Sequence, residues 1–183
     1  AQAQVALRYN LSCATATYEF AEALSNAAVK DGKKAKCHVK VDTGMGRIGV
    51  HPTQAVSFVK HIAMLPNIEI EGIFTHLATS EDNNKTFLHR QLSLFDDTIC
   101  ALRHNGIEAQ YYHTANSVAA VTVPEARFHI VRPGIFLYGL TPLHGERARR
   151  LRAELDIVPA LTLKTRGGFV KRLPSGPSIG YGP

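Results

Sequence analysis

The sequence predicts an α/β fold in which about five strands form part of a (β/α)8 TIM barrel. First, short runs rich in β-branched residues alternate with segments whose apolar residues recur at helical spacing, which is typical of parallel sheets built from βαβ units. Second, four unusual polar clusters each follow a predicted strand directly, where such barrels carry their active sites. Five strands do not close the barrel, so we expect about three more before residue 1.

The predicted strands and helices alternate in order along the chain. The expected strands span residues 11–16, 36–41, 68–75, 110–114 and 128–131. Thr17 is a suitable N-cap for a helix over 18–30, and Gly32 ends it. Further helices are expected from Pro52 to before Asn67, over 87–104, and over 118–121. Beyond residue 159, the segments 160–165 and 169–173 alternate apolar with polar residues, which predicts antiparallel strands.

Composition excludes several classes of protein. Of the 183 residues, 45% are hydrophobic and 20% are charged, which is ordinary for a globular chain. No apolar run approaches the ~20 residues that span a bilayer. The net charge is +6, but no aromatic residues interleave with the basic runs at 30–36 and 147–152. We therefore expect neither membrane insertion nor nucleic-acid binding.

The cysteines and histidines indicate a reducing compartment and no metal site. Cys13, Cys37 and Cys100 are odd in number and far apart, which argues against both disulfides and zinc. The histidines show no metal-ligand spacing. We expect a cytoplasmic protein without a bound metal ion.

The most informative stretch is residues 40–49, KVDTGMGRIG, directly after a predicted strand. Three glycines within six residues permit a tight loop with close backbone approach. Arg47 lies between the second and third glycine and presents a planar fork of donors suited to an oxygen-rich group. The alternative is a simple turn with a surface arginine. Three further polar clusters follow predicted strands, at His76, at 116–117 and at 132–134, and would converge with this loop at one barrel mouth.

Five motifs together resemble alanine racemase. They are KVDTGMGRIG at 40–49, GIFTH at 72–76, HTANS at 113–117, VRPGI at 131–135 and SIGYG at 178–182. The resemblance implies a pyridoxal 5'-phosphate (PLP)-binding barrel followed by a β domain, in a head-to-tail homodimer. It assigns residues 1–140 to the barrel, 141–158 to a linker and 159–183 to the start of the β domain.

The resemblance implies three catalytic residues. Arg132 matches the arginine that faces the pyridine nitrogen of PLP, and His76 matches a histidine bonded to that arginine. Tyr181 matches the tyrosine that acts as acid and base on one face of the substrate in the partner subunit's site. Because arginine only donates, Arg132 requires an unprotonated ring nitrogen.

The resemblance also implies the cofactor-binding residues. Arg47 matches the arginine on the phenolic oxygen of PLP, and Lys40 matches an often carbamylated lysine that orients it. A lysine that only snorkels from its strand is the alternative for Lys40. The expected phosphate site lies between two loops, at Asn116, Ser117, Gly134 and Ile135.

The implied activity is PLP-dependent interconversion of L- and D-alanine by two-base α-proton transfer, which supplies D-alanine for peptidoglycan. The lysine that anchors PLP in this family matches no lysine here, so we expect this stretch of chain alone to be inactive. Three alternatives remain open: a non-catalytic PLP-binding barrel protein, a racemase for serine or another amino acid, and a degenerate or truncated product with no activity.

Overall fold

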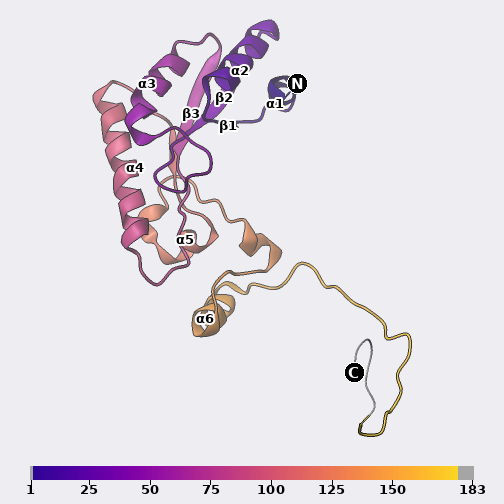
Figure 1. Cartoon of the computed structure of the whole chain (residues 1–183). Helices are drawn as coiled ribbons and strands as arrows, with labels where there is room; N and C mark the ends of the chain where they lie inside the picture. The colour runs from indigo at the N-terminus through magenta and orange to yellow at the C-terminus, as the bar shows by residue number, and fades with distance from the viewer. Residues whose placement is uncertain (1, 177–183) are drawn as a thin grey trace.

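The computed structural model describes residues 2–176, and its centre is one parallel sheet of four strands (Figure 1). The strands are β1 (Cys13–Thr15), β2 (Ala35–Lys40), β3 (Ile68–Phe74) and β4 (Tyr111–His113). They lie side by side in chain order, and every neighbouring pair is parallel. Parallel strands in chain order with helical crossovers form an open segment of an α/β barrel, which confirms the predicted fold class.

Helices connect the strands. They are α1 (Gln2–Arg8), α2 (Tyr18–Lys30), α3 (Pro52–Ala63), α4 (Thr86–His104), α5 (Ser117–Thr122) and α6 (Gly145–Leu155), with short 3-10 helices η1 (Pro124–Ala126) and η2 (Ile135–Tyr138). The predicted N-cap of α2 is confirmed, since the Thr17 side chain accepts from the backbone N–H of Phe20 at 3.3 Å. Helices α1 and α6 were not predicted from the sequence. None of the helices within residues 2–176 has the length and hydropathy of a membrane-crossing segment.

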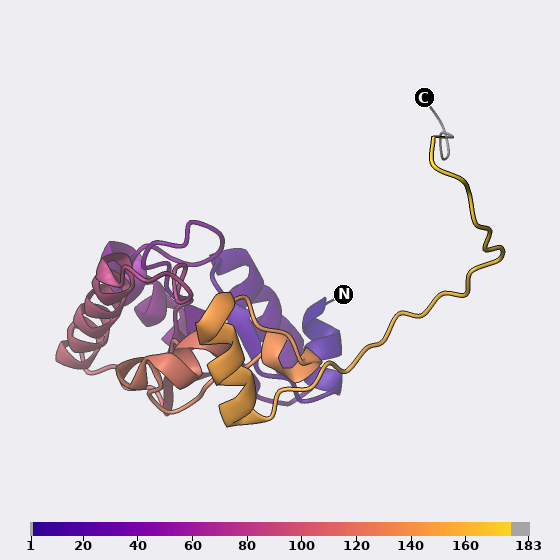
Figure 2. The same cartoon turned by 90° about the horizontal axis from the view of Figure 1, so that it is seen from below.

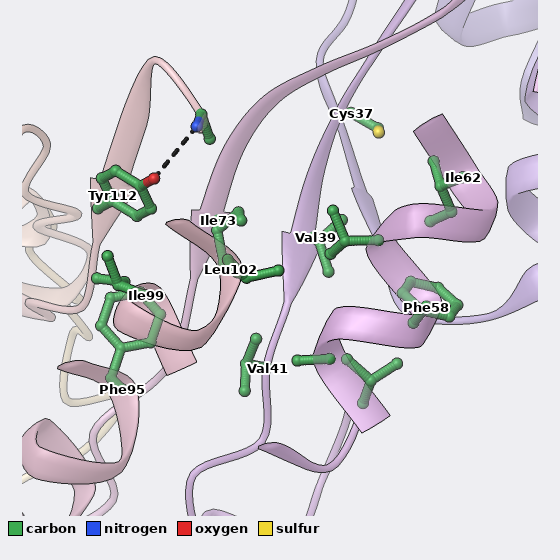
Figure 3. Packing of buried hydrophobic residues seen from close by; sticks show 14 of the residues in the cluster. Cys37, Val39, Val41, Phe58, Ile62, Ile73, Phe95, Ile99, Leu102 and Tyr112 are labelled. Atoms are coloured by element: carbon green, nitrogen blue, oxygen red, sulfur yellow. Dashed lines mark hydrogen bonds between the residues drawn. The ribbon is translucent and has the colours of Figure 1, made fainter. Parts of the chain in front are cut away.

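Helices α3 and α4 cover one face of the sheet with an apolar core. Val39 and Ile73 of the strands pack among Phe58 of α3 and Phe95 and Leu102 of α4, all of them buried (Figure 3). Successive side chains of a strand point to opposite faces. The polar residues that alternate with this core therefore lie on the other face, which is the inside of the barrel segment.

The predicted fifth strand, over residues 128–131, is wrong. Phe128 has φ 46°, in the left-handed region, which interrupts an extended backbone. The segment still runs beside the end of β4, because the backbone N–H of Arg132 donates to the carbonyl of Ala115 at 3.0 Å. One isolated bridge pairs Arg132 with Asn116. The chain thus follows the sheet without forming a ladder.

The expected antiparallel strands over 160–165 and 169–173 are also not formed within the described residues. Both views show this part of the chain leaving the body as an extended trace (Figures 1 and 2). Leu163 is 96% exposed and Val170 90% exposed, so the apolar face of the pattern has no surface to pack against here. A strand needs a hydrogen-bonding partner as well as an alternating pattern. Helix α6 lies inside the predicted linker at 141–158, and the proposed domain boundaries stay a prediction.

Candidate functional site

A cavity of about 240 Å³ lies beyond the carboxyl ends of β3 and β4. Its lining includes predicted site residues from three separate stretches of the chain, namely His76, Asn116, Ser117, Arg132, Gly134 and Ile135. Glu81, Val118 and Pro142 complete the lining. The predicted convergence of polar clusters at the strand ends is therefore observed for these six residues.

Arg132 is held at the centre of this cavity wall by several acceptors. Its Nη1 lies 2.6 Å from Nδ1 of His113, and its Nη2 donates to the carbonyl oxygens of Thr75 at 2.8 Å and Thr114 at 3.2 Å. Its Cζ lies 5.2 Å from the ring centroid of Phe74, a cation–π contact. Burial lowers the pKa of Arg132 to about 10, so the guanidinium still carries its charge at neutral pH.

His76 lies beside Arg132 but carries no charge at neutral pH. Its Nδ1 is 3.5 Å from Nη2 of Arg132, the long limit of a hydrogen bond. Burial, followed by the positive charges of Arg132, Arg47 and Lys40, lowers the pKa of His76 to about 4. A neutral imidazole offers one acceptor nitrogen and one donor nitrogen. His76 can therefore accept from Arg132 and donate to a group in the cavity.

The two loops that carry Ser117 and Gly134 are joined to each other. The backbone N–H of Gly134 donates to Oγ of Ser117 at 2.8 Å. Asn116 is the N-cap of α5, because its Oδ1 accepts from the backbone N–H of Ala119 at 3.0 Å. The first turns of α5 and η2 thus begin at the same place, with hydroxyl and backbone N–H groups suited to a phosphate. A Cβ added at Gly134 would meet nothing within 4 Å, so the space in front of it is open.

The glycine loop after β2 is shaped by a carboxylate that the sequence analysis did not single out. Asp42 Oδ1 accepts from the backbone N–H groups of Gly44 at 3.0 Å and Gly46 at 3.1 Å. Although burial raises the pKa of Asp42, its bonds from backbone N–H groups outweigh burial and lower it overall. Gly49 has φ 136°, and a Cβ there would meet the Asp42 nitrogen at 2.7 Å. Gly49 is therefore required by the loop itself.

Lys40 and Arg47 lie near the cavity without lining it. Lys40 is 5% exposed at the end of β2, whereas Arg47 is exposed in the glycine loop. Burial, and then the charge of Arg47, lowers the pKa of Lys40, and the charge of Arg132 acts in the same direction. Three cations thus give this end of the sheet a positive potential. An anionic ligand, such as a phosphate ester with an ionised phenolic oxygen, fits this charge and the hydroxyl and amide groups opposite.

Two further residues of the site were not assigned a role from sequence. Gln91 of α4 is fully buried, and its Nε2 donates to the His76 carbonyl at 3.1 Å while its Oε1 accepts from the Ala78 N–H at 2.8 Å. His113 ends β4 and contacts Arg132 directly. A signal for His113 was present, since it stands inside the HTANS motif at the end of a strand. Tyr181 lies outside the described residues.

A family model described as "Alanine racemase, N-terminal domain" matches residues 1–142. The chain belongs to the alanine racemase family. An alanine racemase of Halothermothrix orenii is 39% identical over 181 residues, which cover 99% of this chain and 46% of that relative. The alanine racemase of Desulfovibrio desulfuricans is 41% identical over 164 residues, 90% of this chain and 43% of its own length. The chain thus spans about half the length of the curated relatives that it matches.

Solved alanine racemase structures share the fold. The structure from Clostridium difficile 630 in complex with cycloserine matches with a TM-score of 0.75 and 30% identity, over 82% of this chain and 41% of that one. The structure from Bacillus anthracis with bound L-Ala-P matches with a TM-score of 0.69 and 30% identity, over 80% of this chain and 38% of that one. The described sheet therefore corresponds to part of the barrel in these alanine racemases.

Proposed function

We propose that a polypeptide comprising this chain and the remaining length of its relatives is a PLP-dependent racemase that interconverts L- and D-alanine. The observation that supports it most is the cavity in which His76, Arg132 and Ser117 meet from three stretches of chain. Family membership supports the same reaction. We further propose that this protein is a cytoplasmic homodimer and that its D-alanine serves peptidoglycan synthesis.

The cofactor supplies an electron sink for the α-proton chemistry. Ser117 and Gly134, with Asn116 and Ile135 beside them, would hold the phosphate group through hydroxyl and backbone N–H contacts. Arg132 would donate to the ring nitrogen, and it accepts no proton in return because guanidinium has only donors. Arg47 would donate to the phenolic oxygen, with Lys40 behind it in either its cationic or its carbamylated form.

The chain's own residues would hold protons at defined atoms. His76 is neutral and accepts at Nδ1 toward Arg132, so its Nε2 carries a proton. Tyr181 would serve as acid and base on one face of the substrate, and racemisation needs a second base on the opposite face. That second base is the anchoring lysine of the family, which none of the lysines in this sequence matches.

The test is exchange of the alanine α-proton in heavy water by the full-length protein with PLP. We expect deuterium in both enantiomers from either starting enantiomer. Arg132→Lys keeps the charge but removes the planar fork, and should lower kcat/KM by at least about tenfold. Arg127→Lys is the matched control, because the side chain of this exposed arginine, five residues earlier, donates only to the carbonyl of Ala120 within residues 2–176. Bound PLP without α-proton exchange would establish a non-catalytic PLP protein instead.

A further inference from the structure

Four polar side chains form a continuous line across the inside of the barrel segment, leading away from the cavity. Nδ1 of His113 lies 2.6 Å from Nη1 of Arg132, and Nε2 of His113 lies 2.8 Å from Nδ1 of His38. Nε2 of His38 in turn lies 3.0 Å from Oε2 of Glu71. The line joins one residue of β2, one of β3 and one of β4 to the arginine that follows the sheet.

The two ends of the line fix every proton between them. A guanidinium only donates, so Nδ1 of His113 accepts from Arg132 and the proton of His113 lies on Nε2. That proton is donated to Nδ1 of His38, which leaves Nε2 of His38 to donate to the carboxylate of Glu71. Each histidine is thus neutral, in one tautomer, and all the hydrogen bonds run in the same direction from Arg132 to Glu71.

The charge states agree with this direction. Hydrogen bonds from Ser12, Lys36 and His38 lower the pKa of Glu71 to about 2, so it is ionised at neutral pH. Burial, followed by the charge of Arg132, lowers the pKa of His113 to about 3, so this imidazole is neutral. Lys36 anchors the far end with its Nζ 2.9 Å from Oε1 of Glu71.

The backbone of β3 is adapted to this line. Cys37 pairs with Ile70 and His38 pairs with Gly72, so the register shifts there and leaves Glu71 as an extra residue. Such bulges re-aim side chains and are common near active sites. A Cβ added at Gly72 would lie 2.3 Å from Nδ1 of His38. The bulge and the glycine together make room for the His38 ring between Glu71 and His113.

We propose that Glu71, His38 and His113 are positioning residues that hold the Arg132 guanidinium in one orientation toward the cofactor ring through a directed hydrogen-bond line. This inference rests on the proposed function for the role of Arg132. Phe74 supports the same arrangement, because its ring stacks on His113 at 4.8 Å and 7° and lies under the guanidinium.

The first test reads the tautomers directly in the full-length protein with PLP bound, by 15N NMR of labelled histidine rings. We expect His113 and His38 each to show a protonated Nε2 and an unprotonated Nδ1. A proton on Nδ1 of His113 in the unmodified protein would overturn the proposal, whatever the variants do.

The second test uses two pairs of variants. In Glu71→Gln, the amide oxygen should face Lys36 and the amide NH2 should face His38. The tautomers of His38 and His113 should then both reverse. As a result, an N–H of His113 would face the N–H groups of Arg132, and that hydrogen bond would be lost. Glu69→Gln is the matched control. It makes the same change two residues earlier on β3, and within the described residues the Glu69 carboxylate has no hydrogen bond to a histidine.

The second pair of variants changes His38. His38→Leu should break the line, whereas His38→Gln should restore it, because the amide has one donor group and one acceptor group.

Breaking the line should weaken PLP binding, measured by titration, about tenfold in Glu71→Gln and His38→Leu, since a bond to a charged group is lost. Glu69→Gln and His38→Gln should stay within about threefold of the unmodified protein. Unchanged PLP affinity and tautomers in Glu71→Gln, with normal α-proton exchange in the unmodified protein, would overturn the positioning role alone. Failure of the unmodified protein to bind PLP would overturn the proposed function itself.

Discussion

Gly72→Ala tests whether the packing of His38 depends on a missing side chain. The added Cβ would meet His38 Nδ1 at 2.3 Å, Cε1 at 2.5 Å and Cγ at 3.0 Å, against an ordinary contact of 3.4–4 Å. The ring must therefore move by about 1 Å. Its bonds to His113 at 2.8 Å and Glu71 at 3.0 Å would then both exceed hydrogen-bond length.

The expected cost follows from these contacts. Overpacking costs about 1–3 kcal/mol, and two lost hydrogen bonds cost about 1 kcal/mol each. Alanine also stabilises the folded state by about 0.4–1 kcal/mol, because it lowers the conformational entropy of the unfolded chain and the backbone of Gly72 is not in the left-handed region. Gly72→Ala should thus lower the free energy of unfolding by about 2–5 kcal/mol.

The assay is urea unfolding of the full-length protein, in a double-mutant cycle with His38→Ala. With the ring removed, Gly72→Ala should become neutral or slightly stabilising, so the two changes should couple by about 2 kcal/mol or more. Gly168→Ala is the matched control, since a Cβ there meets nothing within 4 Å, and it should leave stability nearly unchanged. Additivity of Gly72→Ala and His38→Ala within about 0.5 kcal/mol would refute the steric argument.

Three further predictions concern stability without PLP. The unfolded chain takes up protons on His76 and His113 near pH 6.5, whereas burial lowers their folded pKa values to about 4 and about 3. The free energy of unfolding should therefore fall as pH drops from about 6.5 toward 3, by up to about 3 kcal/mol for His76, in urea titrations at several pH values. Gln91→Leu leaves a buried N–H and a buried carbonyl unpaired and should cost about 2–4 kcal/mol in the same assay. Asn116→Ala removes the N-cap of α5 and should cost about 1 kcal/mol, against no loss for Asn26→Ala on the exposed side of α2.

Each of these has an outcome that would contradict it. A free energy of unfolding that stays constant between pH 6.5 and 4 would mean that His76 and His113 take up protons as readily in the folded protein as in the unfolded chain. Gln91→Leu with unchanged stability would show that the loop after β3 does not depend on this amide. Equal effects of Asn116→Ala and Asn26→Ala would remove the capping role.

Periodicity predicted the regular elements well where a local pattern and a tertiary partner agree. The strands at 36–41 and 68–75 and the helices at 18–30 and 87–104 recur in the structure within a residue or two. The pattern at 128–131 is equally apolar, yet Phe128 adopts a left-handed φ and no ladder forms. Helix α6 was missed because it is strongly charged, with one buried residue, Leu151, and so has almost no apolar stripe to read.

The sequence by itself determined the fold class, the family and most residues of the cavity, because these depend on local spacing and on motifs that are contiguous in the chain. The loop at 40–49 and the clusters at 76, 116–117 and 132–134 could be named before any contact was known. Only the tertiary structure decided that His38, Glu71 and His113 form one line to Arg132. The three residues stand on three different strands. Glu71 lies 33 positions and His113 lies 75 positions after His38 in the sequence, and the register shift beside Gly72 brings them together. A hydrogen-bond direction set by partners so distant in sequence leaves no periodic trace along the chain.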